Sequence, residues 1–397
     1  MNVQARHASP EFNAKITLAF IACHVAGLIF LPAMPLVMGA FVRDFAANPD
    51  WLGRIASLQL ITTAIGAFCF SIVGRRVNCR LLVILALAGE ILINIGTANA
   101  NGVVSLLILR GFSGFSQGML LAAAGAGAAL SKRTEKTFAL YNIALAVFAV
   151  MVLVCGATVV PHYGNTGVFG LILCVDILAL MVVLGQFPTF RLVRKEDNAP
   201  PLRIRAIPGA FRVLLALGLF GIALSGTQTF MERLGFYHGS TLEVMAIALA
   251  LGWCIAIMSP FILLLYCHTR CRISGLLLVA YTGIAILALV LSYAPTSHVY
   301  LMAMALFTPV IMFIEPLQFG VLGRLDSSGR LAALGPAAIS IGCGAGPLLT
   351  SIMVKVFSLL GVGVFACTLF ILSFILLFPI SQIAGVNPSA KKYRLAQ

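Results

Sequence analysis

The chain has 397 residues; 61% of them are hydrophobic, only 10% are charged, and the formal net charge is +14. Soluble domains carry charge on about a quarter of their residues, so this composition argues against a soluble enzyme. A membrane-spanning helix needs about 20 apolar residues, and the chain is long enough for a dozen such helices joined by short connections. An all-α, multi-pass membrane protein is therefore predicted.

The apolar runs, taken in chain order, predict twelve membrane spans. The first fifteen residues are polar and lack a signal-peptide pattern, so the first span is expected to be retained. The spans are expected at about residues 16–41, 54–73, 81–99, 103–130, 138–161, 166–187, 213–231, 244–266, 273–294, 299–322, 332–354 and 363–385.

Lysine and arginine are concentrated in alternate loops, which explains the positive charge without a nucleic-acid partner. Of the 26 such residues, only Arg43, Arg54, Arg233 and Lys355 fall on the opposite side, and Arg110 lies within a span. The positive-inside rule then places both termini in the cytoplasm. The predicted location is a plasma membrane, most simply a bacterial inner membrane.

The chain also repeats itself at an offset of 192 residues. Arg80, after Cys79, corresponds to Arg272, after Cys271, and Lys132 corresponds to Arg324. Internal repeats of this kind are typical of transporters, whose substrate site lies between the repeats. We therefore expect a six-helix half at 1–187, a basic cytoplasmic linker at 188–212 and a second six-helix half at 213–397.

This arrangement of two six-span halves resembles the major facilitator superfamily over essentially the whole chain. In span 4, Arg110 to Gly114 is similar to the R-x-x-x-G signature of that family. The family's loop between spans 2 and 3 is represented by Gly74 and three basic residues, with Gly74 at the position of the usual acid. The structural and gating residues that the resemblance implies are Gly114, Arg75, Arg76, Arg80, Arg324, Asp326, Arg330, Gly346 and Pro347.

The resemblance implies that spans 1, 4, 7 and 10 line a central cavity. His24, Arg110, Gln228 and Glu315 fall one on each of these spans. Gln117 lies two turns after Arg110, near the same helix face. Charged groups are costly in the hydrocarbon, so each of them needs a structural or functional reason.

Glu315 is the first candidate for a proton site. A carboxyl group in a low-dielectric cavity can bind and release a proton near neutral pH. Pro309 and Pro316 flank it, so its span is expected to be kinked there. A permanent pair with Arg110 is the alternative for Glu315.

Three further roles are left open by the sequence. Arg110 binds an anionic substrate, holds Glu315 or Glu90, or gives structural support to the first half. His24 is a second titrating group or a neutral, hydrogen-bonded one. Glu90 and Asp176 lie on spans that the resemblance places outside the cavity, where we expect protonated or locally paired groups.

The predicted function is secondary active transport of a small organic solute, with an anionic or zwitterionic solute favoured, by alternating access and coupled to protons. A proton-driven multidrug or lipophilic-cation exporter and a non-transporting membrane sensor are the alternatives. No ATP-binding loop occurs, and the histidines are scattered without catalytic or metal-binding spacing. We therefore predict no enzyme activity, no cofactor and no metal; the expected partners are the solute, protons and membrane lipids, and the chain is expected to be a monomer.

Overall fold

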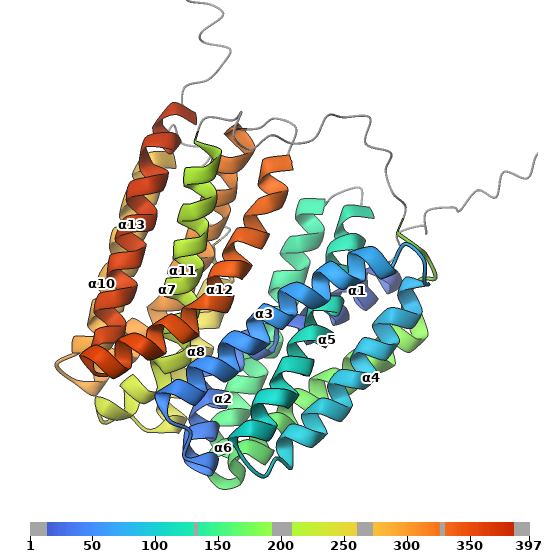
Figure 1. The fold of residues 1–397 in the computed structure, drawn as a ribbon, viewed down its shortest axis with the longest axis horizontal. Coiled ribbons are helices and arrows are strands. Elements are labelled where there is room, and N and C mark those ends of the chain that lie inside the picture. Colours follow the sequence, from blue (N-terminus) through green and yellow to red (C-terminus); the bar gives the residue numbers. More distant parts are fainter. Residues whose placement is uncertain (1–13, 131–133, 193–208, 260–272, 326–329, 385–397) are drawn as a thin grey trace, which may run out of the picture. The chain divides into compact units, whose positions relative to one another are not determined.

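The computed structural model describes residues 14–130, 134–192, 209–259, 273–325 and 330–384, and its regular elements are all α-helices (Figure 1). The described residues belong to two compact units, one within Met1–Ala47 and Leu58–Asp197 and the other within Asn48–Ser57 and Asn198–Gln397. The early helices are α1 (Ala14–Leu28), α2 (Phe30–Phe45), α3 (Pro49–Val73), α4 (Cys79–Ala98), α5 (Val103–Leu130) and α6 (Thr134–Gln186). The later helices are α7 (Ala210–Tyr237), α8 (Leu242–Ala256), α10 (Ile273–Tyr293), α11 (Ser297–Leu325), α12 (Arg330–Phe357) and α13 (Gly361–Ala384).

Ten of the helical segments among these residues are long and apolar enough to cross a membrane. One of them lies within α6, which has 53 residues and a non-helical backbone at Gly164, so it accounts for two of the predicted spans. The shorter apolar helix α8 corresponds to the first part of the predicted span 8, and the rest of that span lies largely outside the described residues. The helices therefore accommodate all twelve predicted spans.

The first predicted span is one helical segment, Ala14–Phe45, and it ends beyond the predicted residue 41. It has a local irregularity between α1 and α2 at Ile29, which keeps right-handed helical dihedral angles (φ −58°, ψ −25°). A proline ring clashes with the carbonyl group four residues earlier. For Pro32 this residue is Leu28, where α1 ends, so the irregularity falls where the proline removes one helical hydrogen bond.

Two neighbouring charged residues of α2 form hydrogen bonds with the backbone at the break in α6. Arg43 Nη1 donates to the carbonyl oxygens of Val160 (2.8 Å) and Pro161 (2.6 Å), and Asp44 Oδ2 accepts from the backbone N–H of Asn165 (2.5 Å). Backbone groups released from a helix in a membrane must find other partners. Here α2 supplies them on both sides of Gly164, whose φ is 52°.

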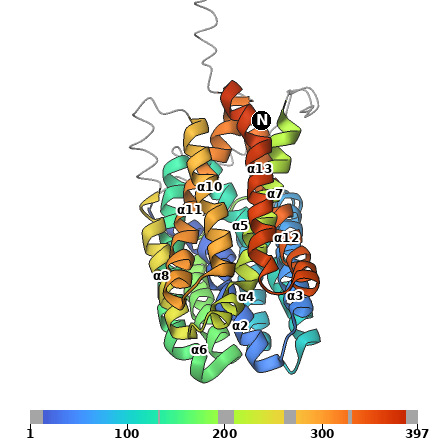
Figure 2. The same ribbon diagram turned by 90° about the vertical axis from the view of Figure 1, so that its left-hand side faces the viewer.

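In the first unit, α1 packs on α5 and α6, α4 packs on the same two helices, and α2 packs on α6 (Figure 1). The core around Phe20 and Tyr141 is apolar: their neighbours include Cys23, Leu87 and Phe187. In the second unit, α7 packs against α12 and α13, α10 against α11 and α13, and α8 against α11 (Figure 2).

Glycines allow several helices to approach each other at backbone distance. A Cβ atom on Gly342 of α12 would collide with the backbone of Gly218 in α7, and one on Gly221 of α7 would collide with the backbone of Ile339. In the first unit, a Cβ atom on Gly114 of α5 would collide with the carbonyl group of Gln59 in α3. Such small residues are the usual means by which membrane helices pack closely.

Candidate functional site

The structure places Arg110 of α5 in a fully buried position in the first unit. Its Nη2 donates to Asn94 Oδ1 (2.8 Å) and to Thr97 Oγ1 (2.7 Å), both on α4. Its guanidinium carbon lies 4.5 Å from the ring centroid of Phe169 on α6. Nε and Nη1 have no hydrogen-bond partner among the described residues. The guanidinium group is therefore held by neutral groups and an aromatic face.

Glu90 of α4 is fully buried as well and lies close to the same part of α5. Its Oε1 accepts hydrogen bonds from Ser113 Oγ (2.7 Å), Gln117 Nε2 (3.0 Å) and Asn94 Nδ2 (3.3 Å). Its Oε2 has no partner among the described residues. Gln117 in turn accepts from Gln59 Nε2 of α3 at 3.1 Å.

Asn94 joins the charged groups to one another. Its Nδ2 also donates to Asp176 Oδ2 of α6 at 2.7 Å, so one amide group contacts Glu90, Asp176 and Arg110 at once. Within the described part of the chain, Arg110 makes no direct ion pair with either carboxylate. We call these buried side chains the polar network: Gln59, Glu90, Asn94, Thr97, Arg110, Ser113, Gln117 and Asp176.

The sequence pointed to Arg110 and Gln117 but missed Asn94, Thr97 and Ser113. A signal was present, because Glu90, Asn94 and Thr97 follow a spacing of four and then three residues, which places them on one face of a helix. Arg110, Ser113 and Gln117 follow the complementary spacing on the next helix. Asn94, Thr97 and Ser113 are uncharged, and each is inexpensive in a membrane by itself, so none stands out in the sequence as a charged residue does.

His24 of α1 lies elsewhere in the first unit and is only 8% exposed. Its ring is 5.1 Å from that of Tyr141 on α6, and its Nε2 has no hydrogen-bond partner among the described residues. Tyr141 O–H donates to the carbonyl oxygen of Ala124 on α5. The histidine is thus part of a packed aromatic layer between α1, α5 and α6.

In the second unit, Glu315 lies on α11 and is half-buried. The described residues provide it with no ion pair and no hydrogen bond, in contrast to Glu90. Gln228 of α7 is 9% exposed, and its Oε1 has no partner in the described part of the chain. Gly346 of α12 packs against the backbone carbonyl group of Ile222 and the side chain of Ser225 in α7.

The basic loop after α3 is tied to the end of α6. Arg80 Nη2 donates to the carbonyl oxygen of Leu184 (2.6 Å), while the N–H of Leu192 donates to the carbonyl oxygen of Gly74 (2.8 Å). Arg75 and Arg76 are exposed. A side chain at Gly74 would press on Phe70 and Leu192, so an acid does not fit there without a shift. Asp326 and the side chains of Arg324 and Arg330 lie outside the described residues.

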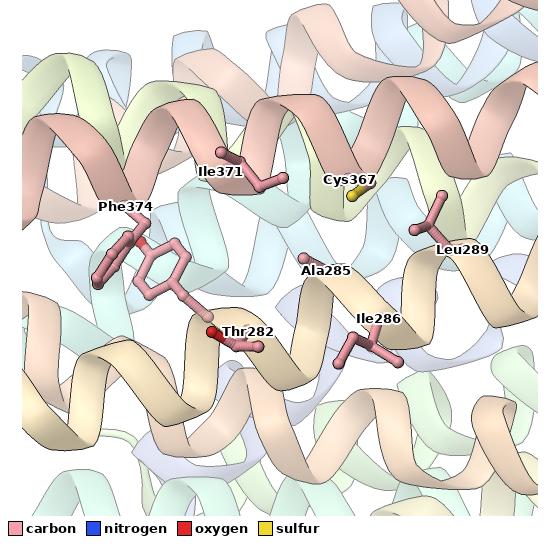
Figure 3. A pocket seen from close by; sticks show the side chains of 8 residues that line it. Thr282, Ala285, Ile286, Leu289, Cys367, Ile371 and Phe374 are labelled. Atoms are coloured by element: carbon pink, nitrogen blue, oxygen red, sulfur yellow. The ribbon is translucent and has the colours of Figure 1, made fainter.

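A groove between α10 and α13 has a volume of about 280 Å³ (Figure 3). It is lined by Tyr281, Thr282, Ala285, Ile286, Leu289, Cys367, Ile371 and Phe374. The Tyr281 hydroxyl group is already hydrogen-bonded to Ser373 and Gln318. The lining suits a hydrocarbon chain rather than an ionised solute, and it contains none of the predicted site residues.

Comparison with known proteins identifies the fold. No protein-family model and no curated protein matches the sequence. Among solved structures, the chain is similar to the nucleoside transporter NupG, with a TM-score of 0.71, 12% identity, and coverage of 92% of this chain and 98% of that one.

Two other transporters are similar over nearly the same length. For a bacterial homologue of the human lysosomal transporter Spinster, the TM-score is 0.69 with 12% identity, covering 94% of this chain and 98% of that one. For FucP, a major facilitator superfamily transporter, the TM-score is 0.61 with 16% identity and the same coverage. The predicted family resemblance is therefore confirmed at the level of structure: the chain has the twelve-helix, two-half fold of the major facilitator superfamily transporters.

Proposed function

We propose that the chain is a secondary active transporter of a small organic solute, anionic or zwitterionic, which works by alternating access and is coupled to protons through Glu315. The observation that supports the proton coupling is the environment of Glu315. Its carboxyl group is half-buried, lies between two prolines within α11, and has no ion pair or hydrogen bond among the described residues. A carboxyl group in that situation is free to exchange a proton, because no fixed cation holds it ionised.

The other proposed coupling or binding residues are Arg110, Gln117, His24 and Gln228. Gln228 has an unpartnered amide oxygen and offers a hydrogen-bond acceptor to a solute. Arg110 and Gln117 are fully or almost fully buried within the polar network, which favours an indirect role for them over direct contact with the solute. We further propose that the protein lies in a bacterial inner membrane with both termini in the cytoplasm, and that it works as a monomer.

The test is proton movement into proteoliposomes with a pH-sensitive dye trapped inside. The panel contains organic anions, amino acids, sugars and lipophilic cations, and wild type is compared with Glu315→Gln. We expect one solute class, an organic anion or an amino acid, to drive proton movement in the wild type, and we expect Glu315→Gln to abolish it. Glu243→Gln, at the exposed start of α8, is the matched control and should leave the flux unchanged.

Each other outcome indicates a different function or mechanism for this protein. Solute uptake without proton movement means that Glu315 is not a coupling residue. Flux driven only by lipophilic cations identifies a multidrug exporter instead. If the folded wild type moves no member of the panel, the non-transporting sensor becomes the better description.

A further inference from the structure

The polar network of the first unit holds more negative than positive charge. Three ionisable side chains face one another in it, namely Glu90 from α4, Arg110 from α5 and Asp176 from α6, and all three are fully buried. The residue that α3 contributes is the neutral Gln59. The nearest acid of α2, Asp44, is occupied by the backbone at the α6 break. With every group ionised, the network would carry one uncompensated negative charge.

An uncompensated charge in this position is expensive. The free energy of burying an ion away from water is recovered only when an opposite charge or several hydrogen bonds compensate for it. The two carboxyl groups are also close, since both accept a hydrogen bond from the same nitrogen atom of Asn94. Two carboxylates that share one low-dielectric site do not both ionise. One bound proton makes the network neutral.

The hydrogen bonds distinguish the two carboxyl groups. Glu90 Oε1 accepts from three donors, Ser113, Gln117 and Asn94, whereas Asp176 accepts, among the described residues, from Asn94 alone. Donors aimed at a carboxyl oxygen stabilise its ionised form. We propose that Glu90 and Asp176 form a proton-binding site, in which Asp176 holds the proton and Glu90 stays ionised beside Arg110.

The unused atoms of the network indicate how the proton leaves. Arg110 Nε and Nη1, Glu90 Oε2 and Asp176 Oδ1 are all buried, and none has a partner among the described residues. When Asp176 loses its proton to water, its new carboxylate attracts the free donors of Arg110. The guanidinium group then exchanges Asn94 and Thr97 for Asp176, so proton release changes the contacts between α4, α5 and α6.

The change reaches the break in α6 through Thr97. The hydroxyl group of Thr97 accepts from Arg110, and its backbone carbonyl oxygen accepts from Asn165 Nδ2 at 2.6 Å. Asn165 follows Gly164 directly. Hydrogen bonds through Thr97 therefore link the proton site to the break between the two parts of α6. The proton site and Glu315 lie in different units, so each proton assignment can be tested without the other.

Infrared spectroscopy of the purified full-length protein in lipid at neutral pH tests the site without any solute. A protonated carboxyl group gives a C=O band distinct from that of a carboxylate, and ¹³C-carboxyl labelling of aspartate or of glutamate identifies the residue type. We expect an acid band that moves with labelled aspartate and disappears in Asp176→Asn. Glu315→Gln should leave this band unchanged, even if it removes a glutamate band.

Charge balance makes further variants informative. In Arg110→Gln no cation remains, so Glu90 should become protonated too and the acid signal of the network should double. In Glu90→Gln, Asp176 becomes the single counter-charge of Arg110, so its acid band should be lost. Gel filtration establishes that each variant is folded.

Two results would overturn the proposal. If folded wild type shows no acid band that depends on Asp176, the site holds no proton at neutral pH. If the acid band of the network moves with labelled glutamate instead of labelled aspartate, the proton belongs to Glu90 instead.

Discussion

Asn94 uses every hydrogen-bonding atom of its side-chain amide, and each one contacts a different ionisable residue. Its two N–H groups serve Glu90 and Asp176, and its oxygen serves Arg110. Few side chains of similar size can both donate and accept in this way. A carboxylate has no N–H donors, and an apolar side chain has neither donors nor acceptors. Asn94 therefore allows opposite charges to be buried together without direct contact.

Replacing Asn94 should be far more damaging than its lack of charge suggests. Asn94→Leu removes one partner from each of three buried ionisable groups, and breaking such a set costs about 3 kcal/mol or more of the free energy of unfolding. Asn99→Ala is the control: Asn99 is exposed at the end of the same helix and donates one side-chain hydrogen bond to Ile95, so its loss should cost no more than about 1 kcal/mol. Denaturant unfolding in mixed micelles measures both. Similar losses for the two variants would show that the network contributes little to stability.

The candidate site could be predicted from the sequence only as far as single residues are concerned. A charged residue within an apolar run is visible, so Glu90, Arg110, Asp176 and Glu315 were all found. Which of them meet depends on helix rotation and packing, which the sequence does not state. The sequence left a contact between Arg110 and Glu90 as one alternative, whereas the structure joins Arg110, Glu90 and Asp176 in one network through Asn94.

At the scale of the helices, the close pair α7 and α12 depends on positions that have no side chain. Alanine normally stabilises a helix relative to glycine, by about 0.5–1 kcal/mol. At Gly342 the sign should reverse, since the added Cβ atom meets the backbone of Gly218. We expect Gly342→Ala to lower the free energy of unfolding by about 1–3 kcal/mol, the range found for overpacked cores.

Gly283 of α10 is the matched control, because no neighbouring atom lies within 4 Å of the position of its Cβ atom. Gly283→Ala should leave stability unchanged or raise it slightly. Both variants are compared by the same micellar unfolding measurement. Equal stability of the two proteins would mean that α7 and α12 can separate without cost.

Helix positions followed from apolar runs, but helix continuity did not. The twelve spans could be predicted from the sequence because an apolar run long enough to cross a membrane seldom occurs in another kind of structure. The irregularity of the first span at Ile29 and the nearly continuous α6 depend on local backbone geometry near Pro32 and Gly164. Glycine and proline in the sequence mark such places without stating whether a helix stops, bends or continues.

At the scale of the whole molecule, the distribution of charge predicts the orientation in the membrane. Tyr163, exposed at the break in α6, should lie outside the cytoplasm, and Arg75, exposed after α3, should lie inside it. In intact cells, an impermeant maleimide should label Tyr163→Cys, and it should label Arg75→Cys only after permeabilisation. The unmodified chain provides the background of native thiols. The reverse labelling pattern would invert the proposed topology.

The hydrogen bonds from Arg43 and Asp44 to the break in α6 also have a consequence for how the sequences of such chains diverge over time. Surface connections usually tolerate insertions and deletions, since they carry few contacts. The segment from Val160 to Asn165 is different, because Arg43 and Asp44 hold it from both ends. One added or deleted residue would move a partner of α2 out of reach. Homologous sequences should therefore differ in length at their other helix connections and keep a constant length here.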